Sequence, residues 1–264
     1  MSVLVTTFRQ CTALRAPHVL RSQGNFRQSV RMSSSSKITF GDKLPGHYVN
    51  KDTSAKSAVV VVQEWWGIVP EVIRQAEYIS KELKVPVLVP DLYKGSVGVE
   101  AEEAKHMMDN LDFPQAAKEI NQAAEHLRND GAEKVGVVGF CMGGALAFLS
   151  AQGGSFDAVV GFYGAPPGEA RQVDKIKAPC QGHSGSEDSF KGFADPATMK
   201  EFLDSIKGAK TEFYEYKGEG HGFMNADEKD IQDKMRTAEL PKGSKEAQEL
   251  AWKRTFQFLK ANLA

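Results

Sequence analysis

The sequence has few cysteines and lacks any long apolar run. Three cysteines among 264 residues are too few for a disulfide framework. Beyond residue 36 only Cys141 and Cys180 remain, without the spacing of a zinc site, and this usage is typical of a reducing compartment. No apolar stretch approaches the roughly 20 residues that a membrane-spanning helix needs, so we expect no membrane span.

Acidic residues are absent from the first part of the chain. The first acid is Asp42, whereas residues 1–36 contain five arginines and several serines. This composition is typical of an organelle transit peptide, and a basic tail without a targeting role is the alternative. We therefore predict a transit peptide over 1–36 and a mitochondrial location, with a plastid, or a cytosolic product that starts at Met32, as alternatives. The predicted mature N-terminus lies between Arg31 and Lys37.

The remainder of the chain is acidic and long enough for one domain. Residues 37–264 keep 28 basic and 34 acidic residues, a net charge of −6. A body of this charge has no basic face suited to nucleic acid or to an anionic membrane. We expect a single α/β domain over 37–264, present as a monomer or a weak dimer.

From Ser57 onward, short β-branched runs alternate with helical patterns. This alternation predicts a mostly parallel central sheet with right-handed crossovers and helices on both faces. The expected strands are 58–63, 86–90, 157–163, 178–184 and 211–216, and the expected helices are 70–84, 101–111, 112–131, 196–207 and 245–263. Two polar stretches show no such pattern: residues 33–36 and those after them predict a flexible lead-in, and residues 225–244 predict a solvated loop with a single helical turn.

Residues 134–152, KVGVVGFCMGGALAFLSAQ, are interpreted as a buried strand, a sharp turn and a helix. The frame GFCMG at 139–143 has the form of the nucleophile elbow of α/β-hydrolases, with Cys141 where serine usually stands. Glycines avoid clashes at such a strained turn, and the helix N-terminus favours a thiolate. The backbone N–H of Met142 would point at a developing oxyanion. A buried structural cysteine in an ordinary turn is the alternative.

A cysteine nucleophile at an elbow needs a base and an acid that orients the base, in the chain order nucleophile, acid, histidine. His221 lies between glycines directly after the expected strand 211–216, and Asp188 lies in a turn after another expected strand. Glu187 is the neighbouring acid candidate. His183 lies inside a strand and precedes the acids, so it is interpreted as structural.

The loop at 62–67, VQEWWG, follows the first expected central strand. In this fold that loop supplies the second oxyanion donor, and the backbone N–H of Trp65 is the candidate, beside that of Met142. Glu64 would then lie close to the thiol, where its carboxylate would disfavour the thiolate. The alternative is that Glu64 only braces the loop that carries Trp65.

Five motifs occur in order along the chain: QEWWG at 63–67, PDLYKG at 90–95, GFCMGG at 139–144, GSED at 185–188 and GHGF at 220–223. With these motifs, the chain from Lys37 to its end resembles the dienelactone hydrolase family, the carboxymethylenebutenolidases. The resemblance implies an α/β-hydrolase fold without a large lid. It also implies hydrolysis of a small-molecule lactone, ester or thioester through an acyl-cysteine intermediate, with no metal and no organic cofactor.

The resemblance also implies site roles. It makes Cys141 the nucleophile, Asp188 and His221 the other members of the triad, and Glu64 the contact of the resting thiol. The bacterial chlorocatechol-pathway members hold the substrate carboxylate with two arginines, one just after the tyrosine of the PDLY-like motif and one a few residues past the histidine.

Neither arginine is present here. The first region holds Tyr93 and Lys94, and the second reads HGFMN at 221–225. Tyr93 and Lys94 are the candidate substrate contacts, although a lysine offers a point charge rather than a bidentate fork. The sequence therefore does not predict whether dienelactone itself is a substrate, but it still predicts the same class of hydrolysis.

Two other classes of function compete with a hydrolase. A low-pKa, accessible Cys141 would suit a redox-responsive protein, but a sensor needs no general base, so Asp188 and His221 argue against it. A non-catalytic binding module would have no need of all three triad residue types. The prediction is therefore a Cys-His-Asp hydrolase.

Overall fold

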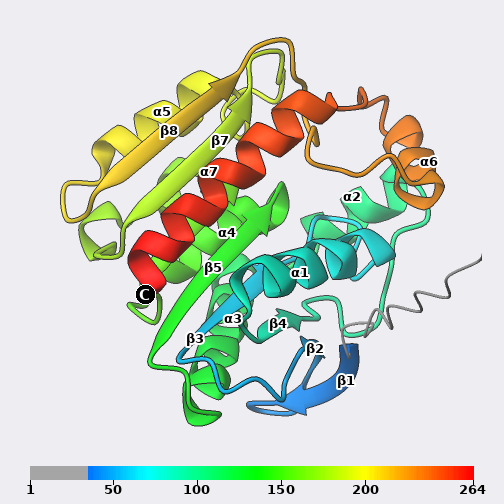
Figure 1. Ribbon diagram of the computed structural model, residues 1–264. Helices are drawn as coiled ribbons and strands as arrows, with labels where there is room; N and C mark the ends of the chain where they lie inside the picture. Colours follow the sequence, from blue (N-terminus) through cyan, green and yellow to red (C-terminus); the bar gives the residue numbers. More distant parts are fainter. Residues whose placement is uncertain (1–34) are drawn as a thin grey trace, which may run out of the picture. The chain divides into compact units, whose positions relative to one another are not determined.

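The computed structural model describes residues 35–264, and one eight-stranded sheet runs through them in the order β1-β2-β4-β3-β5-β6-β7-β8 (Figure 1). β2 pairs antiparallel with β1 and with β4, and every other neighbouring pair is parallel. The predicted transit peptide lies outside the described residues except for its last two, so targeting and cleavage stay predictions. β1 begins at Ser35, two residues before the predicted start of the domain.

The strands are β1 Ser35–Phe40, β2 Leu44–Val49, β3 Ser57–Val62, β4 Val87–Pro90, β5 Lys134–Phe140, β6 Ala158–Phe162, β7 Cys180–Gly185 and β8 Thr211–Tyr216. The helices are α1 Pro70–Leu83, α2 Ala101–Asp109, α3 Phe113–Asn129, α4 Met142–Ala151, α5 Pro196–Ser205, α6 Lys229–Thr237 and α7 Lys245–Leu263, with short 3-10 turns at Gly168–Ala170 and Val173–Lys175. In the described part of the chain, no helix is long and apolar enough to cross a membrane.

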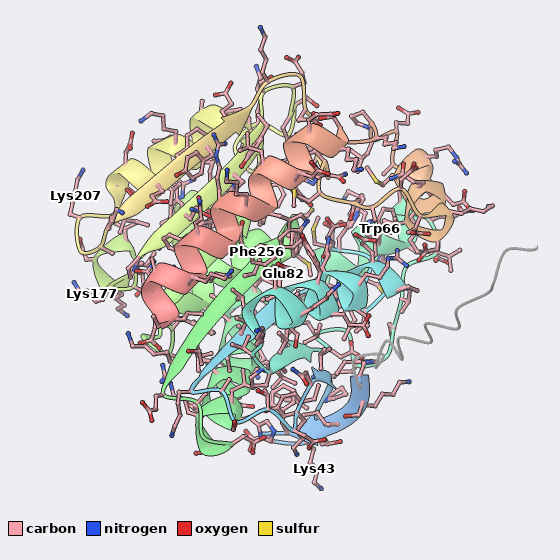
Figure 2. The ribbon with its side chains drawn as sticks, viewed as in Figure 1. Lys43, Trp66, Glu82, Lys177, Lys207 and Phe256 are labelled. Atoms are coloured by element: carbon pink, nitrogen blue, oxygen red, sulfur yellow. The ribbon has the colours of Figure 1, made fainter. Side chains whose placement is uncertain are left out.

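The central strands are buried because helices cover both faces of the sheet. Helices α1 and α7 lie on one face, and α3, α4 and α5 lie on the other (Figure 1). The two helices of the first face pack through aromatic rings: Phe256 on α7, labelled in Figure 2, meets Tyr78 on α1 with ring centroids 5.3 Å apart. Valines 59–62 of β3 are fully buried, as expected for a strand covered on both faces. The predicted mostly parallel sheet with helices on both faces is confirmed.

The predicted flexible lead-in is wrong from residue 35 onward, because β1 and β2 form an antiparallel hairpin there. β2 continues into the main sheet by pairing with β4, and Tyr48 and Val49 are buried. The sequence of β2, LPGHYV, does not predict a strand, because proline and glycine are unfavourable inside strands. Pro45 is tolerated because it lies at the end of the β2–β4 ladder, where its carbonyl accepts the N–H of Asp91 at 2.9 Å just past the end of β4.

The predicted solvated loop at 225–244 is wrong in its centre, where α6 forms a nine-residue helix. Only Ile231 and Met235 are buried in α6, and both pack against Trp66. Trp66 lies on the side of the structure that carries α6 (Figure 2). Two apolar residues four positions apart give too weak a periodic signal to predict a helix from sequence.

The elbow allows no side chain at Gly139. A Cβ atom there would lie 1.9 Å from the carbonyl oxygen of Gly143, and that oxygen is backbone that cannot turn away. We expect Gly139→Ala to lower the free energy of unfolding by about 3 kcal/mol or more, as severe overpacking does, measured by urea denaturation. The control is Gly168→Ala, because a Cβ at Gly168 meets nothing within 4 Å; its change should stay within about 0.5 kcal/mol. Equal stability of the two variants would contradict the clash.

Candidate active site

Five polar side chains meet at the carboxyl ends of neighbouring strands. Glu64 follows β3, Cys141 follows β5, Tyr163 follows β6, Asp188 follows β7 and His221 follows β8. Because these strands are parallel and adjacent in the sheet, their carboxyl ends share one edge. In open α/β sheets this edge is where ligands bind.

Cys141 occupies a strained turn between β5 and α4. Its φ is 54° and its ψ is −119°, a conformation that residues with a Cβ rarely adopt. Close backbone packing fixes the turn: the N–H of Cys141 donates to the carbonyl of Phe162 at 3.0 Å, and a Cβ on Gly164 would lie 2.1 Å from the carbonyl oxygen of Cys141. The turn therefore holds the sulfur at the N-terminus of α4.

The structure brings Cys141, His221 and Asp188 together in one chain of contacts. Nε2 of His221 lies 3.0 Å from Sγ of Cys141, and Nδ1 lies 2.8 Å from Oδ2 of Asp188. The side chain of Asp188 is 0% exposed and that of His221 is 7% exposed. Asp188 Oδ1 also accepts the N–H of Phe190 at 3.2 Å, so the carboxylate is held on both sides.

The surroundings of His221 favour its charged form. Burial by itself lowers the pKa of His221, but the facing sulfur of Cys141 and the hydrogen bond with Asp188 raise it to about 10. A cationic imidazole beside the sulfur stabilises a thiolate, which is the nucleophilic form of cysteine. The arrangement therefore places a charge-stabilising imidazole directly against the nucleophilic sulfur.

The two predicted oxyanion donors lie beside Cys141. Met142 is the first residue of α4, so its N–H has no acceptor within the helix. Trp65 lies in the turn after β3 and lines the cavity at Cys141. Both backbone positions suit stabilisation of negative charge on a substrate oxygen.

A small cavity of about 80 Å³ opens at the sulfur. It is lined by Trp65, Met108, Cys141, Phe190, Phe193, His221 and Leu240. Met108, Phe190, Phe193 and Leu240 were not predicted as site residues. Phe190 and Phe193 follow Asp188 by two and five positions, and this closeness in sequence was the available signal; Met108 on α2 and Leu240 after α6 gave none.

The sequence predicted that Glu64 contacts the thiol, but the structure shows no hydrogen bond between them. Its buried carboxylate accepts hydrogen bonds from the hydroxyl of Tyr163 at 3.1 Å and from the amide of Asn225 at 3.3 Å, whereas Sγ of Cys141 faces His221. Burial raises the pKa of Glu64 to about 7, although the nearby His221 and the bond from Asn225 oppose the rise. Through these two bonds, Glu64 anchors the loop that carries Trp65, in agreement with the alternative interpretation.

Tyr163 and Asn225 were missed by sequence reasoning. Tyr163 is the first residue after β6, so position at a strand end could have found it. Asn225 lies four positions after His221, and closeness to the histidine was its only signal. The ring of Tyr163 also packs edge-on against the ring of His221, with centroids 5.1 Å apart. Tyr163 therefore connects Glu64 to the imidazole, while Asn225 holds the carboxylate of Glu64.

The two predicted substrate contacts differ in position. The hydroxyl of Tyr93 lies 3.2 Å from Sδ of Met142, and burial together with the nearby Cys141 raises the pKa of Tyr93. Lys94 pairs instead with the buried Glu119 of α3, with Nζ 3.6 Å from Oε1, and it does not line the cavity. Neither residue lines the cavity, but Tyr93 lies against Met142 beside Cys141, whereas Lys94 is paired away from the site.

His183 is buried within the sheet, as interpreted from sequence. Its ring nitrogens lie 2.8 Å from the hydroxyl of Tyr216 and 2.8 Å from Oε1 of Gln181. Burial and the nearby Arg254 lower the pKa of His183 to about 3, so the ring is neutral. Among residues 35–264, no group of three or more histidine, cysteine, aspartate and glutamate side chains could hold a metal ion.

The model of the dienelactone hydrolase family matches residues 44–263. The chain belongs to the dienelactone hydrolase family. Distant relatives in this family include the carboxymethylenebutenolidase of Pseudomonas putida, 28% identical over 193 residues, which are 67% of this chain and 80% of the relative. Carboxymethylenebutenolidase 1 of Cupriavidus pinatubonensis is 27% identical over 198 residues, which are 69% of this chain and 81% of the relative. This dienelactone hydrolase family member is a carboxymethylenebutenolidase-like hydrolase.

Solved structures of the dienelactone hydrolase family share the fold. P91, a dienelactone hydrolase-like promiscuous phosphotriesterase from metagenomic libraries, superposes with a TM-score of 0.74 at 18% identity, covering 88% of this chain and 99% of P91. The dienelactone hydrolase of Anabaena variabilis gives a TM-score of 0.60 at 17% identity, with coverage of 88% and 99%. The predicted α/β-hydrolase fold is confirmed.

The raised pKa of Glu64 predicts a pH-dependent stability. The carboxyl titrates at 4.5 when unfolded and at about 7 when folded, so folding takes up protons between these values. The free-energy cost of burying ionised Glu64 is therefore absent below about pH 4.5 and reaches its full size above pH 7. We expect Glu64→Gln to gain roughly 2–3 kcal/mol of unfolding free energy over wild type on going from pH 5 to pH 8.

Urea denaturation at the two pH values measures this gain. The matched control is Glu82→Gln, which removes an exposed carboxylate of α1 (Figure 2) and should show no such pH dependence. A difference between Glu64→Gln and wild type that stays constant with pH would show that Glu64 is ionised throughout.

Proposed function

We propose that this dienelactone hydrolase family member cleaves a carboxylic ester, lactone or thioester through an acyl-enzyme on Cys141. The observation that supports it most is the contact chain from Sγ of Cys141 through His221 to Asp188, with distances of 3.0 Å and 2.8 Å. Nucleophile, base and orienting acid within hydrogen-bond reach are the signature of covalent acyl transfer.

In the first half of the reaction, the thiolate of Cys141 attacks the substrate carbonyl. The N–H groups of Met142 and Trp65 stabilise the oxyanion of the tetrahedral intermediate. His221 then gives its proton to the leaving alcohol or thiol, and the carbon–oxygen or carbon–sulfur bond breaks. The product of this half is an acyl thioester on Cys141.

In the second half, neutral His221 takes a proton from a water molecule, which attacks the thioester. The carboxylic acid leaves, and Cys141 returns as a thiolate beside the imidazolium. Asp188 keeps the Nδ1 side of His221 protonated, so Nε2 faces the reacting atoms throughout. Glu64 supports this arrangement through Tyr163, whose ring packs against His221.

The test is to trap the acyl-enzyme. The purified protein is mixed with p-nitrophenyl acetate, quenched in acid within one turnover, and weighed intact by mass spectrometry. The expected result is the mass of one acetyl group, located by peptide mapping on Cys141 and not on the buried Cys180. Turnover without any adduct on Cys141, or no reaction with a panel of esters, lactones and thioesters, would overturn the proposal.

A further inference from the structure

The cavity at the sulfur of Cys141 is mostly apolar, and the one described lining residue that can carry positive charge, His221, already faces the sulfur and Asp188. Its walls beyond Cys141 and His221 are aromatic, methionine and leucine side chains. The one cation that the sequence offered to a substrate, Lys94, is paired with Glu119. A carboxylate placed in such a cavity would lose its water without gaining a partner, which is strongly unfavourable.

Charge near the cavity adds to this exclusion. Asp188 is buried behind His221, and Glu64 is buried beside Tyr163. His221 supplies one compensating positive charge, but it already faces the sulfur and Asp188. An additional anion would therefore have to share the single imidazolium with the sulfur and Asp188.

The cavity is also small. Its volume of about 80 Å³ is roughly half of the 150 Å³ in which an apolar protein cavity takes up benzene. The space beside Sγ therefore favours a short acyl group over a long one. The acyl-enzyme holds its acyl group on Sγ, so the acyl group must fit here.

Backbone hydrogen bonds hold two of the walls in place. The carbonyl of Phe193 accepts the N–H of Ala165 at 2.7 Å, and the N–H of Leu240 donates to the carbonyl of Met235 in α6 at 2.9 Å. Met235 itself is buried against Trp66. The walls are thus fixed by neighbouring structure, and largely preformed pockets are what select ligands by size.

We infer that the enzyme acts on uncharged substrates with a short acyl group, and discriminates against acyl groups that carry a carboxylate. This inference rests on the proposed function, because it concerns the group that Cys141 takes up. Leu240 and Phe193 set the length limit. The lack of a second cation among the described wall residues sets the charge preference.

The length limit is tested with p-nitrophenyl acetate, butyrate, hexanoate and octanoate. We expect kcat/KM to be highest for acetate or butyrate and at least about tenfold lower for octanoate, within the range that a hydrophobic pocket achieves for extra methylenes. Leu240→Ala and, separately, Phe193→Ala should move the optimum to a longer chain. A flat series in wild type would overturn the length limit.

The charge preference is tested with a matched pair of lactones. Dienelactone carries a carboxylate, and 4-methylenebut-2-en-4-olide is the same ring without it. We expect wild type to prefer the uncharged lactone by at least about tenfold in kcat/KM, because the carboxylate finds no partner. Leu240→Arg should shift this ratio toward dienelactone by supplying a cation in the wall.

Leu250→Arg is the matched control, since it adds the same charge on α7 at a residue that is 42% exposed and outside the cavity; it should leave the ratio unchanged. Acylation of Cys141 by dienelactone as fast as by the uncharged ring would overturn the inference and leave the proposed function intact. Failure of every substrate to acylate Cys141 would overturn both.

Discussion

Cys141→Ala is expected to lower kcat/KM for every accepted ester by at least about 10⁴-fold, because the variant lacks the atom that takes up the acyl group. Residual hydrolysis would come from the oxyanion donors and substrate binding alone. The measurement is steady-state hydrolysis of p-nitrophenyl acetate, together with circular dichroism to establish that the variant is folded. Activity like that of wild type would remove Cys141 from the mechanism.

Cys180→Ala is the matched control for the nucleophile. The thiol of Cys180 lies in β7, is fully buried and donates to the carbonyl of Ala178 at 3.3 Å. Burial raises the pKa of Cys180 to about 12, so its thiolate is not formed near neutral pH. We expect kcat/KM of this variant to stay within about twofold of wild type, since no general base faces the sulfur.

Asp188→Asn is expected to lower kcat by about 10²–10⁴-fold while keeping the shape of the site, because the amide no longer holds His221 in the productive tautomer. The hydrogen bond with Asp188 raises the pKa of His221, so its loss should lower that pKa. The imidazolium would then be lost at a lower pH. The alkaline limb of the profile of kcat/KM against pH should therefore move to lower pH by at least one unit. One unit corresponds to a loss of about 1.4 kcal/mol in the stabilisation of the imidazolium.

The control for Asp188 is the neighbouring acid that sequence left as its competitor. Glu187 is exposed and accepts only a local hydrogen bond from Ser186, at 3.1 Å. Glu187→Gln should leave both kcat and the pH profile as in wild type. A shift of the alkaline limb in Glu187→Gln rather than in Asp188→Asn would exchange the roles of the two acids.

The sequence predicted that the triad residues come together because each of them follows the end of a strand. Cys141 and Asp188 follow buried strands, and His221 follows the half-buried edge strand β8. Parallel neighbours in a sheet bring such residues to one edge. The Val-rich strands and amphipathic helices carry a periodic signal strong enough to place them without a structure. Most of the fold and the convergence of these three residues could therefore be predicted.

The remaining features depend on contacts between distant segments. Lys94 looked like a free cation, yet it pairs with Glu119, which lies 25 positions later on α3. The partners of Glu64 could not be foreseen for the same reason: Tyr163 and Asn225 both bond its carboxylate, and neither is near it in sequence. Leu240 reaches the cavity only because α6 packs on Trp66 through two apolar residues, and no local pattern reveals such a contact.

The origin of the cavity walls has a consequence for how this protein can diverge. The reacting groups are held by the strands of the sheet, whereas Leu240 comes from the segment that follows α6 and Met108 from α2. After gene duplication, a copy could gain a new substrate by changes at these wall positions alone. The reacting atoms would keep their distances, so selection can act on the choice of substrate and on catalytic rate as two nearly independent traits.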